Sequence, residues 1–247
     1  MKIVLFLFVM AISFVYGFTT GYYGIFPYQQ ILLIKQFFNS NNVVTNTVQI
    51  NNPTDDINKP NILIIGDSIS LGYTPYVRKL LEDEVDIFRI PENGRHTGYG
   101  IRKLNEWLSI EKNWEVIHFN WGLWDLKYIE PTNNNKKGVQ RYTVIEYKKN
   151  LEYLIKELKK TKAKLIWCNT TPIPDNTTSR VKGDELNYNA AALEIMKKND
   201  IVINDLHSFA FQDINNIQIP NNIHFSNSGY EYLSKKVANE IIKALTN

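Results

Sequence analysis

Apolar and polar residues follow two alternating patterns from about residue 60 to the C-terminus. Short apolar runs, rich in β-branched side chains, predict five buried strands, at residues 61–66, 85–90, 115–121, 163–169 and 200–204. Between them, apolar side chains recur at helical spacing, most clearly in residues 143–160 and in the last helix, 230–245. Weaker helical patterns cover residues 97–110 and 184–198. This alternation predicts a parallel sheet covered by helices on both faces.

The first 59 residues have a different character. Residues 3–26 are largely apolar and carry no charge, which fits either a signal peptide cleaved after Gly17 or an uncleaved membrane anchor. Residues 27–59 combine a short apolar helix with a linker rich in Asn, Thr and Pro. We therefore expect a signal-anchor or signal peptide at 1–26, a helix and linker at 27–59, and a folded domain at 60–247. Either interpretation implies export, membrane-anchored or secreted.

Composition narrows the possible functions. Of the 247 residues, 44% are hydrophobic, which is enough for a sizeable core, and the net charge is only +3. Since the charges are mixed along the chain, no basic stripe indicates a nucleic-acid partner. The single cysteine, Cys168, excludes an intramolecular disulfide and disfavours a cysteine-based zinc site, and the four histidines show no metal-binding spacing. We expect neither a metal nor a cofactor.

Polar residues gather where the predicted strands end. Four such segments are residues 66–68, 92–95, 119–125 and 221–229. Parallel strands end at one edge of a sheet, so these segments are expected to meet there. Ser68 is a candidate nucleophile, His224 a candidate base, and Gly94 and Asn120 candidate oxyanion donors. The combination predicts serine ester hydrolysis, although the chain has no G-x-S-x-G elbow of the ordinary α/β-hydrolases.

These segments resemble those of the SGNH/GDSL hydrolases, a family named for Ser, Gly, Asn and His in four conserved blocks. The similar segments are Gly-Asp-Ser-Ile-Ser at 66–70, Asn-Gly at 93–94, residues 120–125, and residues 223–230. The resemblance, which covers about residues 60–245, implies a three-layer α/β/α fold with a parallel, flavodoxin-like five-stranded sheet. It also implies that Ser68 is the nucleophile, that His224 is the base, and that the N–H groups of Ser68 and Gly94 form the oxyanion hole.

The chain departs from the third block of the family. The usual pattern is Gly-x-Asn-Asp, and here Trp124 stands where Asn belongs. Asn120 is the alternative source of the side-chain amide, since residues two apart on a strand share a face. Asp125, the last residue of the pattern, is expected to brace a loop.

The second departure is at Asn221, where the family usually has the Asp that orients the catalytic His. Three explanations are open. The Asn221 amide or a backbone carbonyl accepts the imidazole N–H, leaving a Ser-His dyad; Asp213 or Asp205 takes the role of the acid; or the enzyme is weak or inactive. Where a triad depends on its Asp, an Asn in that place lowers turnover about 10⁴-fold.

Three further residues are candidates to line a substrate cleft: Asp67, Arg95 and Trp124. Each also has a structural interpretation, since Asp67 could cap the helix turn and a Trp is often part of the core. The function predicted is an ester hydrolase acting on an O-acylated or O-acetylated carbohydrate or another small acyl ester. The alternatives are an O-acyltransferase to a surface glycan and a non-catalytic glycan-binding protein on the same scaffold.

Overall fold

The computed structural model describes residues 52–53, 56, 58–111, 113–129 and 138–246, all of which lie within one compact unit, Ile50–Asn247. The predicted anchor at 1–26 and most of the predicted linker lie outside these residues. Among the helices that are described, none has the length and apolar character needed to cross a membrane.

A five-stranded parallel sheet forms the centre, in the order β2-β1-β3-β6-β7. Its strands are β1 (Asn61–Ile65), β2 (Asp86–Arg89), β3 (Val116–Phe119), β6 (Lys164–Cys168) and β7 (Val202–Asn204). All five predicted strands are confirmed, each slightly shorter than its apolar run. Every residue of β1 is buried, as expected for a central strand covered on both faces.

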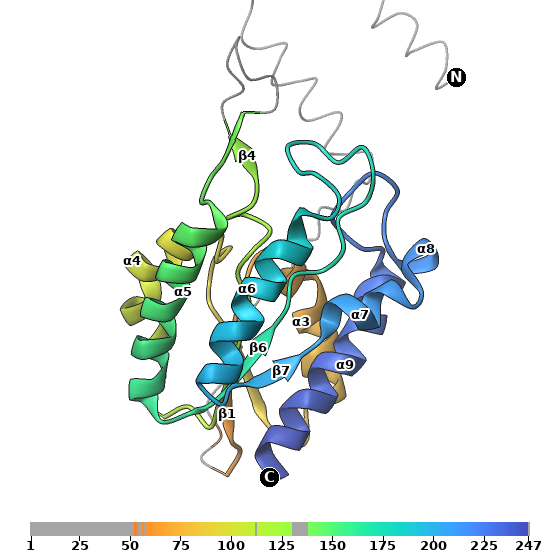
Figure 1. Cartoon of the computed structure of the whole chain (residues 1–247). Coiled ribbons are helices and arrows are strands. Elements are labelled where there is room, and N and C mark those ends of the chain that lie inside the picture. The colour runs from red at the N-terminus through yellow and green to blue at the C-terminus, as the bar shows by residue number, and fades with distance from the viewer. Residues whose placement is uncertain (1–51, 54–55, 57, 112, 130–137, 247) are drawn as a thin grey trace, which may run out of the picture. The chain divides into compact units, whose positions relative to one another are not determined.

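Helices cover both faces of the sheet (Figure 1). On one face α3 (Ser68–Leu80) packs against α9 (Asn227–Thr246), and on the opposite face lie α4 (Thr97–Leu108), α5 (Val144–Leu158) and α6 (Asp184–Lys198). Short helices α7 (Leu206–Phe211) and α8 (Ile214–Ile217) precede α9. A single 3₁₀ turn, η1 (Lys159–Thr161), follows α5. The predicted three-layer α/β/α arrangement is therefore confirmed.

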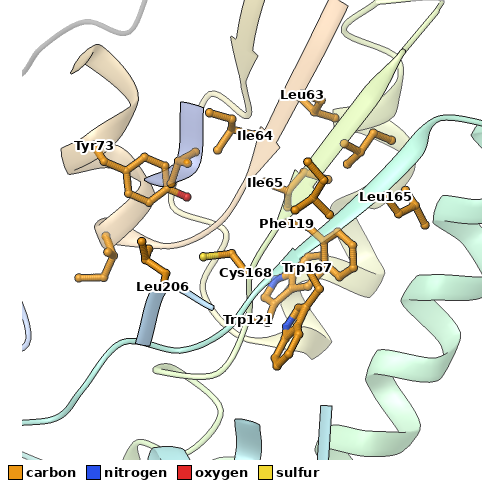
Figure 2. Close-up of a cluster of buried hydrophobic side chains, with 14 of the residues drawn as sticks. Leu63, Ile64, Ile65, Tyr73, Phe119, Trp121, Leu165, Trp167, Cys168 and Leu206 are labelled. Atoms are coloured by element: carbon orange, nitrogen blue, oxygen red, sulfur yellow. The ribbon is translucent and has the colours of Figure 1, made fainter. Parts of the chain in front are cut away.

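The core consists of two apolar layers separated by the sheet. Alternate residues of a strand face opposite sides, and Figure 2 shows Ile64 on the side of Tyr73 and Leu206, with Ile65 on the side of Phe119 and Trp121. All six side chains are nearly inaccessible to solvent. This packing fixes the carboxyl ends of the strands, where the loops that carry the polar segments begin.

A small antiparallel pair has no counterpart among the predictions. Strands β4 (Tyr128–Ile129) and β5 (Val139–Gln140) pair with each other outside the main sheet. Two residues are too few to show an alternating pattern, so neither strand gives a signal in the sequence.

Candidate active site

Ser68 is the first residue of α3 and directly follows the turn after β1. The turn is held by Asp67, whose Oδ1 accepts a hydrogen bond of 2.9 Å from the Ile69 N–H and so caps the helix. At 1% exposure, Asp67 cannot line a substrate cleft, which corrects that prediction in favour of the capping role. A serine at the first helical position leaves its own N–H without an intrahelical acceptor.

His224 meets Ser68 across 156 residues of sequence. Its Nε2 lies 2.9 Å from the Ser68 Oγ. The histidine sits in the loop between α8 and α9, where its carbonyl accepts from the Ile219 N–H at 3.0 Å and the neighbouring Phe225 bridges to Gln218. The structure thus brings together the two residues that the sequence singled out as nucleophile and base.

The other ring nitrogen of His224 is held by Asn222. The Asn222 Oδ1 lies 2.8 Å from Nδ1 and also accepts from the backbone N–H of His224 at 3.0 Å. A carboxamide oxygen only accepts hydrogen bonds, so Nδ1 carries the proton and Nε2 is left as the acceptor for the Ser68 hydroxyl. This is the tautomer that a general base requires.

The residue that contacts His224 Nδ1 is therefore Asn222, one position after the predicted Asn221. Asn221 has a left-handed backbone, with φ of 58°, and its Oδ1 accepts a 3.5 Å hydrogen bond from Asn176. The two acidic residues considered for this role, Asp205 and Asp213, also have other hydrogen-bond partners. Asp205 caps α7 through Ser208, and Asp213 accepts from the side chain of Asn216. Asn222 was not considered from the sequence because it is off the family spacing.

Two of the three predicted oxyanion donors, Gly94 and Asn120, donate hydrogen bonds to backbone carbonyls in this structure. The Gly94 N–H donates to the Gly66 carbonyl at 2.9 Å, and the Asn120 amide donates to the Cys168 carbonyl at 2.7 Å. Each bond ties together the ends of neighbouring strands. Gly94 is needed for a second reason, since a Cβ there would lie 2.7 Å from the Gly66 carbonyl oxygen. In this structure both residues cross-link neighbouring strand ends, and their predicted oxyanion roles stay predictions.

Asp125 braces the loops of the second and third segments. It is completely buried and accepts from the N–H and Oγ1 of Thr97, the first residue of α4, at 3.0 and 2.5 Å. Burial raises the pKa of this carboxyl to about 7. Neighbouring Trp124 is half-buried, with the Lys127 ammonium 5.3 Å from the centre of its ring.

Arg95 and His96 take structural positions after Gly94. Arg95 is exposed, with its guanidinium 4.8 Å from the centre of the Tyr99 ring. The His96 Nδ1 accepts from the Tyr99 N–H at 3.1 Å and caps α4. Burial, followed by the charge of nearby arginines, lowers the pKa of His96 to about 4, so its ring is neutral.

Arg180 is a site residue that sequence reasoning missed. It lies in the loop between β6 and α6, and its Nε donates to the Leu123 carbonyl at 2.8 Å. Burial lowers the pKa of His224, and the positive charge of Arg180 lowers it further. The only signal in the sequence is a lone arginine in a polar loop, which is too weak to predict a position in the site.

A small pocket begins at the residues that directly follow Ser68. Its volume is about 10 Å³, roughly the space that holds one water molecule. Its lining is mostly apolar and includes Ile69, Tyr73, Leu123 and Leu206. Figure 2 shows Tyr73 and Leu206 on the same side of the sheet, near Cys168.

Among the described residues, no group of His, Cys, Asp or Glu side chains is arranged to hold a metal ion.

Comparison with known proteins gives no match by sequence, either to a family model or to a curated protein. Solved structures do match. An acetyl xylan esterase has a TM-score of 0.60 at 16% identity, covering 73% of this chain and 99% of its own. A lipase/acylhydrolase from Enterococcus faecalis has a TM-score of 0.61 at 23% identity, with 74% and 95% covered. A protein assigned as a GDSL-like lipase from Parabacteroides merdae has a TM-score of 0.61 at 15% identity, with 76% and 100% covered.

The chain has the fold of the SGNH/GDSL hydrolases. The strand order, with β1 between β2 and β3, places the carboxyl end of β1 at a switch point of the sheet, where open α/β folds bind their ligands. Ser68 lies at that end. The fold predicted from the resemblance is therefore confirmed, and the part of the chain that carries it spans almost the whole length of these neighbours.

Proposed function

We propose that this protein is a serine ester hydrolase that removes a short acyl group from a carbohydrate or another small ester. The observation that carries the proposal is the chain of contacts from Ser68 Oγ to His224 Nε2, at 2.9 Å, and from His224 Nδ1 to Asn222 Oδ1, at 2.8 Å. Nucleophile, base and orienting group are within hydrogen-bond reach of one another, as covalent catalysis requires.

The reaction proceeds in two halves. The Ser68 Oγ bonds to the acyl carbon while its proton passes to His224 Nε2, and the carbonyl electron pair moves onto oxygen. Collapse of this intermediate breaks the ester C–O bond, and His224 gives its proton to the leaving alcohol. Water then attacks the acyl-enzyme in the same way, releasing the acid and restoring Ser68.

Asn222 supports this chemistry less strongly than a carboxylate. Its oxygen orients the ring and accepts a hydrogen bond from Nδ1–H, but it carries no charge to stabilise the imidazolium that forms. The proposed enzyme therefore uses a Ser68–His224 dyad whose histidine is positioned by the Asn222 amide. Its chemical step is expected to be slower than that of a Ser-His-Asp triad.

We propose that the acyl group is short. The pocket that begins at Ile69, directly after Ser68 in the chain, is small and mostly apolar. Two of the structural neighbours are named as acetylxylan esterases, which is consistent with an acetylated sugar as substrate.

We also propose that the enzyme is exported, because the segment at residues 1–26 is apolar and uncharged from residue 3 onward.

Hydrolysis of p-nitrophenyl acetate, butyrate and octanoate by the purified chain tests the proposal. We expect turnover of the acetate to exceed that of the octanoate and to fall by at least about 10³-fold in Ser68→Ala. Ser228→Ala, on an exposed side chain near the same loop, is the matched control. Full activity in Ser68→Ala would refute the proposal, and a wild-type chain that a fluorophosphonate fails to label would favour glycan binding without catalysis.

A further inference from the structure

The oxyanion formed in the proposed reaction has few donors available. The Gly94 N–H and the Asn120 amide donate to backbone carbonyls, and Trp124 lacks the side-chain amide of the Asn that the family has in its place. Of the predicted donors, only the Ser68 N–H is left at the start of α3. A single donor is a poor match for a tetrahedral oxyanion, which is normally held by two or three.

Arg180 is anchored next to the place where the missing amide would stand. Its Nε donates to the carbonyl of Leu123 at 2.8 Å, one residue before Trp124. Because Nε is fixed in this way, the planar guanidinium has a defined direction. Within the described part of the chain, the Nη nitrogens of Arg180 make no hydrogen bond, so their donors are available to a substrate.

The charge of Arg180 acts on both neighbours of the nucleophile. It lowers the pKa of His224, which contacts Ser68, and it opposes the rise that burial causes in the pKa of Asp67, which precedes Ser68. The Oδ2 of Asp67 is buried without a hydrogen bond. Arg180 itself is half-buried, so its field is less screened than that of a surface arginine.

We propose that Arg180 is a catalytic residue whose Nη–H groups hold the oxyanion, in place of the family's amide. This inference rests on the proposed esterase function. As the Ser68 Oγ bonds to the acyl carbon, the carbonyl electron pair moves onto oxygen and the Ser68 proton moves to His224. Arg180 stays protonated throughout and donates hydrogen bonds to the negative oxygen, which returns its electron pair when the ester bond breaks.

Substitution of Arg180 separates this role from simple substrate binding. In Arg180→Ala we expect kcat for p-nitrophenyl acetate to fall about 10²- to 10³-fold with KM changed by less than about threefold, because the donor acts only on the transition state. Arg180→Lys is expected to recover only part of the loss, since an ammonium cannot reproduce the planar fork.

Two further readouts distinguish catalysis from a structural role. Guanidinium ion at millimolar concentration is expected to restore part of the activity of Arg180→Ala and to leave the wild type unchanged. Lys182→Ala is the matched control, because Lys182 is an exposed cation of the same loop, paired with Asp175 at 2.7 Å. It should keep wild-type kcat, and all variants should keep the wild-type thermal midpoint within about 3 °C.

The outcomes are distinct. Wild-type kcat in Arg180→Ala, or a raised KM with unchanged kcat, would overturn the role of Arg180 while leaving the esterase proposal intact. Loss of activity together with a lowered thermal midpoint and no rescue by guanidinium would assign Arg180 to loop structure alone. Absence of Ser68-dependent hydrolysis in the wild type would overturn both proposals.

Discussion

Asn222 is the residue that decides how the histidine works. Its oxygen accepts both the ring Nδ1–H and the backbone N–H of His224, so a single side chain sets the tautomer and the orientation of the base. Asn221 stands where the family spacing calls for Asp, but its left-handed backbone directs it toward Asn176. The family spacing in the sequence gives no sign of this left-handed turn at Asn221.

Substitution of Asn222 tests its orienting role. Asn222→Ala is expected to lower kcat/KM about 10- to 100-fold, since it removes the two hydrogen bonds that orient His224, each worth about 0.5–1.5 kcal/mol. Asn222→Asp should raise kcat above that of the wild type, because a carboxylate stabilises the imidazolium, and should shift the acid limb of the pH profile to higher pH. Steady-state rates from pH 4 to 9 measure both effects.

Asn221→Ala is the control for this pair of variants. It changes an exposed neighbour with a single long hydrogen bond and is expected to keep kcat/KM within about twofold. If Asn221→Ala were the damaging substitution and Asn222→Ala were silent, the family spacing would be correct and the orientation described above would be wrong.

The start of α9 is the element that positions His224, the proposed base. Ser226 caps the helix, its Oγ accepting from the Gly229 N–H at 3.0 Å. Gly229 lies against α8, where a Cβ would come within 2.3 Å of the Ile217 carbonyl oxygen. The loop that holds His224 is therefore confined between two helices by a contact only glycine allows.

Gly229→Ala should push this contact apart. We expect a loss of about 1–3 kcal/mol in the free energy of unfolding, typical of overpacking, and a lower kcat, because the His224 loop moves with the helix. Urea unfolding and acetate hydrolysis measure the two effects. Asn239→Ala, at an exposed position of α9, should change neither quantity, and an equal loss in both variants would contradict the explanation.

At the scale of the whole molecule, His118 links stability to pH. It lies on β3, completely buried, with its Nε2 3.0 Å from the Asn204 Nδ2. Burial lowers the pKa of His118 from 6.5 to about 4. The unfolded chain therefore binds a proton between pH 6.5 and 4 that the folded protein does not, so His118 stabilises the fold above pH 6.5 and this contribution is lost as the pH falls.

His118→Gln should remove this dependence. We expect the difference in unfolding free energy between wild type and variant to shift by up to about 3 kcal/mol between pH 7 and pH 4, with the wild type losing more in acid. Asp125 acts in the opposite direction, because its pKa is raised to about 7, so the difference between the two proteins is the informative quantity. A constant difference across this range would show that His118 titrates normally.

The sequence by itself determined the central architecture. Short apolar runs rich in β-branched residues, such as Ile62–Ile65, favour strands of a sheet buried on both faces, and helical spacing predicted the long helices that cover it. Ser68 and His224 were also predictable, because each lies in a short segment next to a regular element. The short elements β4, β5, α7 and α8 have too few residues to form a readable pattern.

Only the tertiary structure decided which polar groups remain available for chemistry. Hydrogen-bond partners far apart in sequence occupy the Gly94 N–H and the Asn120 amide, whereas Asn222 and Arg180 are brought to the site by a turn and a loop without any periodic signal. A residue type and its spacing indicate what a side chain could donate or accept. Its actual partner depends on distances of a few ångströms between segments that only folding brings together.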